Sequence, residues 1–188
     1  MSDHGFTHLD DRQVHQGHVW NVAVARFSAP DGTVFERDIV RSPGAVAVVP
    51  VIFDAEGQPS VVLVCQYRPP YEREIIEIPA GMRDVADEPA EDTGRRELVE
   101  EAGLRATEML HLIDMLPSPG MTDSVCSIFL ATGCEPADHD RHGPEEEAME
   151  ILHVPLDEAL SMIDAGDIVD AKSVCGLFAA HRRLTSQG

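Results

Sequence analysis

Three glutamates lie close together at the end of one predicted helix. Pro89 suits the first turn of a helix and Gly103 suits a helix end, so the sequence predicts a helix between these two residues. Glu100 and Glu101 follow Glu97 by three and four positions, which places all three on one face of that helix. They repel one another and also crowd the negative end of the helix dipole. Three carboxylates in this position call for a cation.

The basic residues of the same helix are expected to neutralise other carboxylates. Glu91 precedes Arg95 by four positions and Asp92 precedes Arg96 by four, which is the favourable order for helical ion pairs. Glu97 has no basic residue three or four positions away on either side. Clustered carboxylate oxygens are ligands that Mg²⁺, Mn²⁺ and Ca²⁺ prefer. The sequence therefore indicates a metal site, and the alternative is an acidic helix face covered by solvent.

The residues around these glutamates resemble the Nudix box of hydrolases that act on nucleoside diphosphate linkages. The resemblance covers Gly81, Glu88 and the continuous run of residues 96–104. Six residues separate Gly81 from Glu88 where the usual box has five, so either Asp87 takes the place of the glutamate or the loop carries one extra residue. We favour Glu88, because its spacing to Arg96 is the usual one.

The resemblance implies a role for each residue of the box. Glu97 and Glu101 would bind the metal directly, and Glu100 would be shared between the metal and its bound waters. Ala80 would offer its backbone carbonyl, and Arg96 would orient the carboxylates without touching the substrate. The implied cofactor is Mg²⁺, with Mn²⁺ as an alternative.

Segments outside the box are similar to the ADP-ribose pyrophosphatase branch of this family. They are Gln66-Tyr67-Arg68, residues 77–81, and Ser118-Pro119-Gly120. The resemblance implies substrate contacts for Arg68 and Glu77, and a substrate-pocket wall at Ser118, Pro119 and Gly120. A planar guanidinium is well suited to phosphate oxygens. The alternatives are a surface arginine at a strand end and a simple connecting loop.

Two residues near the N-terminus are weaker candidates for substrate binding. Arg37 is a second candidate for the phosphate contact assigned to Arg68. Trp20 could stack on an adenine ring, and the alternative is a residue packed on the core or on a dimer interface.

A late polar segment, residues 134–147, ends in three consecutive glutamates, Glu145, Glu146 and Glu147. Loops of this length in a compact domain are often functional. The resemblance implies that one glutamate of this loop closes over the metal cluster and acts as the base or as a ligand of a third metal ion. We favour Glu147, with Glu145 and Glu146 next, and the alternative is solvated charge.

Composition restricts the classes of protein to consider. The 188 residues, of which 43% are hydrophobic, are enough for one good core. A net charge of −20 argues against a nucleic-acid-binding or anionic-membrane surface. The four cysteines are scattered and are expected to be reduced thiols in a cytoplasmic protein. The best apolar run, residues 45–53, is too short to span a bilayer.

Apolar runs and turn residues predict the remaining elements. Residues up to about 17 are polar and are expected to be a flexible lead-in. Strands are expected at residues 18–27, 34–40, 45–53, 61–67, 110–116, 125–131 and 149–155, the first two as a hairpin. Helices are expected at residues 156–165 and 171–184.

Periodicity alone supports only a mixed α and β fold. The resemblance implies an α/β/α sandwich around a mixed sheet at residues 44–188, preceded at residues 1–43 by a small antiparallel β extension that forms a homodimer. It also implies metal-dependent hydrolysis of ADP-ribose to AMP and ribose 5-phosphate. The alternatives are another nucleoside diphosphate derivative, such as a nucleotide sugar or a reduced dinucleotide, and a non-catalytic module that binds ADP-ribose. Loss of box carboxylates would mark the non-catalytic module, and every one is present.

Overall fold

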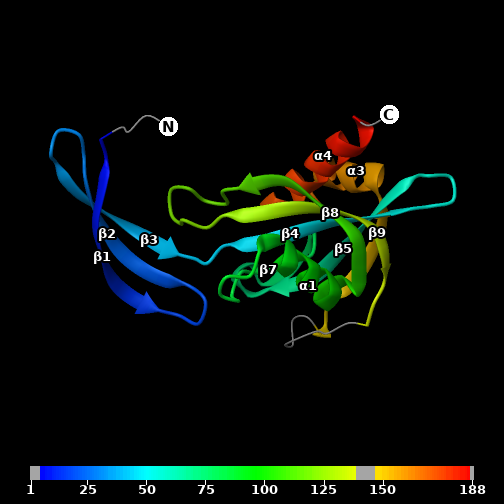
Figure 1. Ribbon diagram of the computed structural model, residues 1–188, viewed down its shortest axis with the longest axis horizontal. Helices are drawn as coiled ribbons and strands as arrows, with labels where there is room; N and C mark the ends of the chain where they lie inside the picture. The colour runs from blue at the N-terminus through cyan, green and yellow to red at the C-terminus, as the bar shows by residue number, and fades with distance from the viewer. Residues whose placement is uncertain (1–4, 139–146, 187–188) are drawn as a thin grey trace. The chain divides into compact units, whose positions relative to one another are not determined.

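The computed structural model describes residues 5–138 and 147–186 (Figure 1). The chain divides into two compact units. Unit 1 comprises Met1–Gly44 together with Leu116–Val125, and unit 2 comprises Ala45–Met115 together with Cys126–Gly188. The segment at residues 116–125 therefore belongs with the N-terminal strands, although it comes from the middle of the sequence.

Unit 1 is an antiparallel sheet of β1 (Thr7–Gln16), β2 (Asn21–Ser28) and β3 (Val34–Arg41), in that order. The predicted hairpin corresponds to β2 and β3, and the expectation of a flexible lead-in up to residue 17 is wrong. Every residue of β1 is exposed, so this strand carries no alternating apolar pattern that the sequence could reveal. It is held instead by backbone pairing with β2 and by ion pairs such as that between Asp10 and Arg26 at 3.0 Å.

The inserted segment of unit 1 is tied to the end of β3. The amide of Val40 donates to the Met121 carbonyl at 2.9 Å, and the Thr122 hydroxyl donates to the Val40 carbonyl at 2.8 Å. Arg41 forms an ion pair with Asp123 at 3.0 Å. These contacts explain why residues 116–125 group with the N-terminal strands.

Unit 2 contains a seven-stranded mixed sheet in its described part. Its main path is β10 (Glu150–Pro155), β5 (Pro59–Arg68), β4 (Ala45–Phe53), β9 (Cys126–Pro136) and β8 (Leu104–Met115). Two short strands join it, β6 (Arg73–Glu77) on β5 and β7 (Ala80–Met82) on β4. Strands β4 and β9 run parallel and the other pairs run antiparallel. A short 3₁₀ helix, η1 (Pro69–Tyr71), connects β5 to β6.

Helices cover both faces of this sheet, which confirms the predicted sandwich (Figure 1). The helices are α1 (Ala90–Ala102), α3 (Leu156–Ala165) and α4 (Ala171–Thr185). Strand β4 is buried on both faces: Val49 packs in the cluster that contains Leu177 of α4, whereas Val48 packs with Leu98 of α1. A continuous apolar run is what a central strand with two covered faces requires.

Strands β8 and β9 extend beyond their predicted ends. The prediction started the first of them at residue 110 and ended the second at residue 131, whereas the two pair from Leu104 opposite Pro136. Gly133 has a left-handed φ of 62°, and a Cβ there would lie 2.0 Å from the Thr107 hydroxyl oxygen. Because of this irregularity and of the polar residues around it, the paired segments at the start of β8 and the end of β9 lack the alternation of apolar and polar residues that predicts a strand. Among the described residues, no helix has both the length and the apolar character needed to cross a membrane.

Candidate active site

The carboxylate of Glu97 lies directly against the backbone of Gly81, where helix α1 meets strand β7. A Cβ on Gly81 would fall 2.0 Å from the carboxylate carbon of Glu97. A side chain at position 81 would force the carboxylate of Glu97 to move, so glycine allows Glu97 to lie against this backbone. The spacing of these two residues in the sequence thus reflects a direct contact in the fold.

Glu101 is fixed to the same strand. Its Oε2 accepts a hydrogen bond of 2.8 Å from the backbone amide of Ala80. Both carboxylates are buried, with 7% exposure for Glu97 and 5% for Glu101. Gly94 lets the helix come this close, because a Cβ at that position would lie 3.1 Å from Val46 of β4. The two glutamates of helix α1 are therefore both buried against strand β7, Glu97 at Gly81 and Glu101 at Ala80.

Arg96 joins the acidic residues of the helix. Its Nη1 donates to Glu97 Oε1 at 2.7 Å and to Glu100 Oε2 at 2.9 Å, and its Nη2 lies 3.5 Å from Glu88. Burial alone would lower the pKa of Arg96, but the charges of Glu97, Glu100 and Glu88 raise it above its ordinary value. The guanidinium thus joins Glu97 and Glu100, and its predicted role in orienting them for a metal stays a prediction.

Two details of the predicted ion pairing differ from the structure. Glu91 and Arg95 pair at 2.8 Å as expected, but in the described contacts Arg96 turns to Glu97 and Glu100 instead of Asp92. The prediction considered only residues three and four positions apart. Glu97 receives its cation from the adjacent residue, because the long side chain of Arg96 reaches Glu97 and Glu100 at once.

Glu88, which we favoured as the first glutamate of the box, lies near Arg96. Its Oε2 accepts a hydrogen bond of 2.7 Å from the Thr93 hydroxyl, in addition to its approach to Arg96. The preceding residue, Asp87, adopts a left-handed φ of 61°. We interpret this turn as the point at which the loop from Gly81 takes up its additional residue.

The donor chemistry of this cluster fits a divalent cation. Glu88, Glu97 and Glu100 share the single guanidinium of Arg96, and Glu101 adds a further carboxylate. Carboxylate oxygens and a backbone carbonyl such as that of Ala80 are hard ligands. In the described part of the chain, no three His, Cys, Asp or Glu side chains are gathered in a metal-binding arrangement. The carboxylate oxygens accept from Arg96 and from the Ala80 amide instead.

The two predicted substrate residues of the sheet bind each other. Arg68 at the end of β5 donates from Nε to Glu77 Oε1 and from Nη2 to Glu77 Oε2, both at 2.6 Å. Glu77 is 3% exposed, whereas the Arg68 side chain is 36% exposed. With both oxygens engaged, Glu77 is better placed to hold Arg68 than to touch a ligand. Their roles in substrate binding stay predictions.

Lys172, which was not among the predicted site residues, is a second cation bound to Glu77. Its Nζ donates to Glu77 Oε2 and to Asp170 Oδ2, the latter at 3.0 Å. Burial would raise the pKa of Glu77, but the hydrogen bond from Arg68 and the charge of Lys172 lower it below the ordinary value. One signal was available, because Lys172 is the only lysine in the chain.

The other predicted residues lie elsewhere. Glu147 is exposed and lies just before β10, and Glu145 and Glu146 fall outside the described residues. Trp20 is 54% exposed, and the guanidinium of Arg37 lies 4.8 Å from the ring centre of Phe35. These two belong to unit 1, which is described separately from the carboxylates.

The predicted pocket wall also belongs to unit 1. The Ser118 carbonyl accepts from the amides of Met121 and Thr122, both at 3.0 Å, so Ser118, Pro119 and Gly120 form part of a hydrogen-bonded turn. Their assignment to substrate binding stays a prediction.

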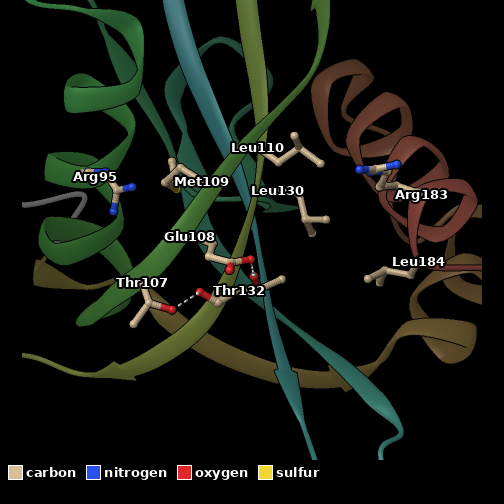
Figure 2. A pocket seen from close by; sticks show the side chains of 9 residues that line it. All are labelled: Arg95, Thr107, Glu108, Met109, Leu110, Leu130, Thr132, Arg183 and Leu184. Atoms are coloured by element: carbon tan, nitrogen blue, oxygen red, sulfur yellow. Dashed lines mark hydrogen bonds between the residues drawn. The ribbon is translucent and has the colours of Figure 1, made fainter. Parts of the chain in front are cut away.

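The structure also contains a cavity of about 460 Å³ (Figure 2). It is lined by residues of β8, β9, α1 and α4, with Arg95 and Arg183 on opposite sides and Glu108 and Thr132 between them. Arg95 donates to Glu91 and, at 2.8 Å, to the Ala106 carbonyl. None of the predicted site residues lines this cavity.

Comparisons with known proteins identify the family. A family model described as NUDIX domain matches residues 43–175. The chain is 34% identical to an ADP-ribose pyrophosphatase of Mycobacterium tuberculosis, over 98% of this chain and 87% of the relative. It is 37% identical to an ADP-ribose pyrophosphatase of Bacillus subtilis, over 86% of this chain and 84% of the relative. A crystal structure of an ADP compounds hydrolase superposes with a TM-score of 0.81 at 22% identity, covering 97% of this chain and 96% of that one, which supports the fold. The contact between Gly81 and Glu97 is thus part of a Nudix box, and the chain belongs to the Nudix family of hydrolases.

Proposed function

We propose that this Nudix enzyme hydrolyses the diphosphate bond of ADP-ribose and releases AMP and ribose 5-phosphate. The observation that carries the hydrolase chemistry is the buried pair of Glu97 against Gly81 and Glu101 on the Ala80 amide. The choice of ADP-ribose rests on the two pyrophosphatase relatives, each at least 34% identical over most of the chain. Arg68 and Glu77, which the resemblance linked to this substrate, lie on the paired strands β5 and β6, and Glu77 precedes Ala80 by three residues.

We assign the metal site to Glu97, Glu100, Glu101 and the carbonyl of Ala80, with Mg²⁺ as the cofactor and Mn²⁺ as an alternative. A divalent cation bound there would neutralise the diphosphate and acidify a water molecule. Arg96 contributes by holding Glu97 and Glu100 together, since its Nη1 bonds to both. A carboxylate that begins in a fixed rotamer loses less conformational entropy when it binds a ligand.

We assign the general base to Glu147, with Glu145 and Glu146 as the next candidates. A carboxylate that is exposed and precedes β10 is free to accept a proton from water. Glu147 lies three residues before the start of β10.

We further propose that residues 1–43 form a homodimer and that residues 44–188 form the catalytic domain. Several large apolar residues of unit 1 have more than half of their surface exposed to solvent: Phe6, Val14, Trp20 and Val34. A small sheet with uncovered apolar residues gains stability when a second surface covers it. Size-exclusion chromatography with light scattering would show a dimer, and a strictly monomeric enzyme would contradict this part of the proposal.

We also propose that the protein acts in the cytoplasm, and the state of its cysteines supports this. All four cysteines are free thiols. Cytoplasmic proteins keep their thiols reduced.

Release of AMP from a panel of diphosphate compounds, measured with and without Mg²⁺, tests the function. ADP-ribose should give the highest kcat/KM, well ahead of nucleoside triphosphates. A clear preference for a guanine nucleotide sugar, or for a triphosphate cut to release pyrophosphate, would contradict the substrate assignment. Tight binding of ADP-ribose without turnover would contradict the assignment as an enzyme.

A further inference from the structure

Lys172 is the only lysine among the 14 lysine and arginine residues of the chain. It lies in the first turn of α4, and its side chain is 14% exposed. Its ammonium contacts Glu77, which is 95 positions away in the sequence, and also Asp170. Because the ammonium of Lys172 is largely buried and pairs with two carboxylates, its position is set by the fold.

The backbone around Lys172 fixes where its ammonium lies. Asp170 caps helix α4 by accepting hydrogen bonds from the Ser173 amide at 3.0 Å and from its hydroxyl at 2.6 Å. The Ser173 hydroxyl oxygen in turn accepts a hydrogen bond of 2.8 Å from the amide of Ile78, the residue after Glu77. The first turn of α4 is therefore anchored to the same segment of chain that carries Glu77.

Glu77 receives two cations, and they differ in exposure. Arg68 is the more accessible of the two, with 36% of its side chain exposed against 14% for Lys172. Glu77 engages Nε and Nη2 of the guanidinium, and Nη1 forms no hydrogen bond with the described residues. Since guanidinium has five N–H donors in a fixed plane, the Nη1 edge of Arg68 can bind another anion while the Nε edge stays on Glu77.

We propose that Lys172 is a positioning residue for the reaction: it fixes Glu77, and Glu77 in turn holds Arg68 so that its Nη1 edge binds the diphosphate of the substrate. This inference rests on the proposed function. Lysine suits the role because its compact ammonium fits between two carboxylates, whereas a second planar guanidinium would compete with Arg68 for the face of Glu77.

Two observations tie the pair to the carboxylate cluster. Glu77 is separated from Ala80 by only Ile78 and Pro79, and the Ala80 amide holds Glu101. The pKa of Arg68 is raised by its hydrogen bond to Glu77, and the charge of Glu101 adds to the rise. Arg68 thus lies close enough to Glu101 to feel its charge, and a diphosphate held through a cation at Glu101 would be attracted by Arg68 as well.

A double-mutant cycle tests the inference. The variants are Lys172→Met, Arg68→Ala and the combination, with Lys172→Arg as the variant that retains the charge. Lys172→Met should raise KM by about tenfold and change kcat by less than about threefold, because it removes binding that substrate and transition state share. In the Arg68→Ala background the same change should alter KM by less than about twofold, since its effect passes through Arg68. Lys172→Arg should recover part of the loss.

An unchanged KM in Lys172→Met would overturn the proposal. So would a double variant whose rise in KM equals the product of the rises in the two single variants. Multiplying effects would mean that Lys172 binds the substrate on its own. A purely structural role predicts a lower melting temperature without a change in KM.

Acetylation of the folded enzyme provides a second route that does not depend on how a variant folds. Because Lys172 is the only lysine, an amine-acetylating reagent can modify only its ε-amine and the N-terminal amine. The enzyme with acetyl-Lys172, verified by peptide mass, should show the same rise in KM as Lys172→Met. Lys172→Arg is the matched control, because the reagent can modify only the N-terminal amine of this variant. The KM of Lys172→Arg should therefore be the same before and after treatment. An acetylated enzyme with the original KM would refute the proposal.

The substrate panel separates this inference from the proposed function. If the wild-type enzyme prefers a different nucleoside diphosphate compound, the substrate assignment fails and the cycle is repeated with the preferred compound. If the wild type cleaves none of them, the proposed function fails, and the dissociation constant of ADP-ribose, measured by calorimetry, replaces KM in the same cycle.

Discussion

The backbone amide of Ala80 donates a hydrogen bond of 2.8 Å to the carboxylate of Glu101, 21 residues further along the chain. This bond ties strand β7 to the last turn of helix α1, and it places the neighbouring Gly81 beneath Glu97. The carboxylates of the Nudix box are therefore positioned by a short strand as much as by the helix that carries them. The first two predictions test this coupling.

Replacing Gly81 with alanine should remove activity by displacing Glu97. The new methyl group would lie 2.0 Å from the carboxylate carbon, so the side chain must leave its place. We expect kcat to fall by about 100-fold or more, because loss of the proposed metal ligand would remove several kcal/mol of charge stabilisation. Steady-state kinetics and thermal unfolding of Gly81→Ala measure the two consequences.

The control for this variant is a second change at the contact itself. In a Glu97→Ala background the alanine at position 81 meets no carboxylate, so Gly81→Ala should cost much less stability there than in the wild type. Equal losses of stability in both backgrounds would show that the contact between Gly81 and Glu97 is unimportant.

Replacing Glu97 or Glu101 with glutamine should lower turnover by about 100-fold or more while the fold survives. The amide oxygen of glutamine can still accept the hydrogen bond from Ala80, and the change also removes repulsion between clustered carboxylates. Without metal, the melting temperature should stay the same or rise.

Glu91→Gln is the matched control, because Glu91 lies on the same helix and, among its described contacts, pairs only with Arg95, which is not one of the proposed site residues. Its kcat should equal that of the wild type. Full activity of both Glu97→Gln and Glu101→Gln at saturating Mg²⁺ would rule out the assigned metal site.

Glu147→Gln should reduce kcat more than it changes KM, because a general base acts mainly in the transition state. Steady-state kinetics with ADP-ribose at a fixed Mg²⁺ concentration measure both constants. A triple variant of Glu145, Glu146 and Glu147 that keeps its rate would show that the segment is solvated charge and that the base lies elsewhere.

The sequence predicted the helix that carries the box glutamates and the central strand well, for identifiable physical reasons. Helix α1 begins after Pro89 and ends before Gly103, both of which have conformations suited to a helix boundary. Strand β4 matches its predicted range because both of its faces are buried, which leaves an unbroken apolar run.

Other features depend on contacts that sequence spacing does not reveal. Strand β1 is exposed at every residue, so only its pairing with β2 makes it a strand. Lys172 reaches Glu77 across 95 positions of sequence, because α4 packs against the segment after β6. Arg68 was predicted to bind substrate, but its bidentate pair with Glu77 does not follow even from the pairing of β5 and β6, which places Arg68 opposite Arg73 and Glu77 opposite Val64.

The charge state of Glu77 should make its contribution to stability depend on pH in a defined direction. Its folded-state pKa is lowered: burial opposes ionisation, but the hydrogen bond from Arg68 and the charge of Lys172 outweigh it. A carboxylate with a lowered folded-state pKa stabilises the fold above its unfolded pKa, which is about 4.3 for glutamate, and this stabilisation is lost as the pH falls through the folded-state value. The difference in melting temperature between the wild type and Glu77→Gln should therefore be largest near neutral pH and shrink below about pH 4. Thermal unfolding of both proteins between about pH 3 and pH 8 measures it. A difference that stays constant across this range would mean that Glu77 stabilises the fold by shape and not by its charge.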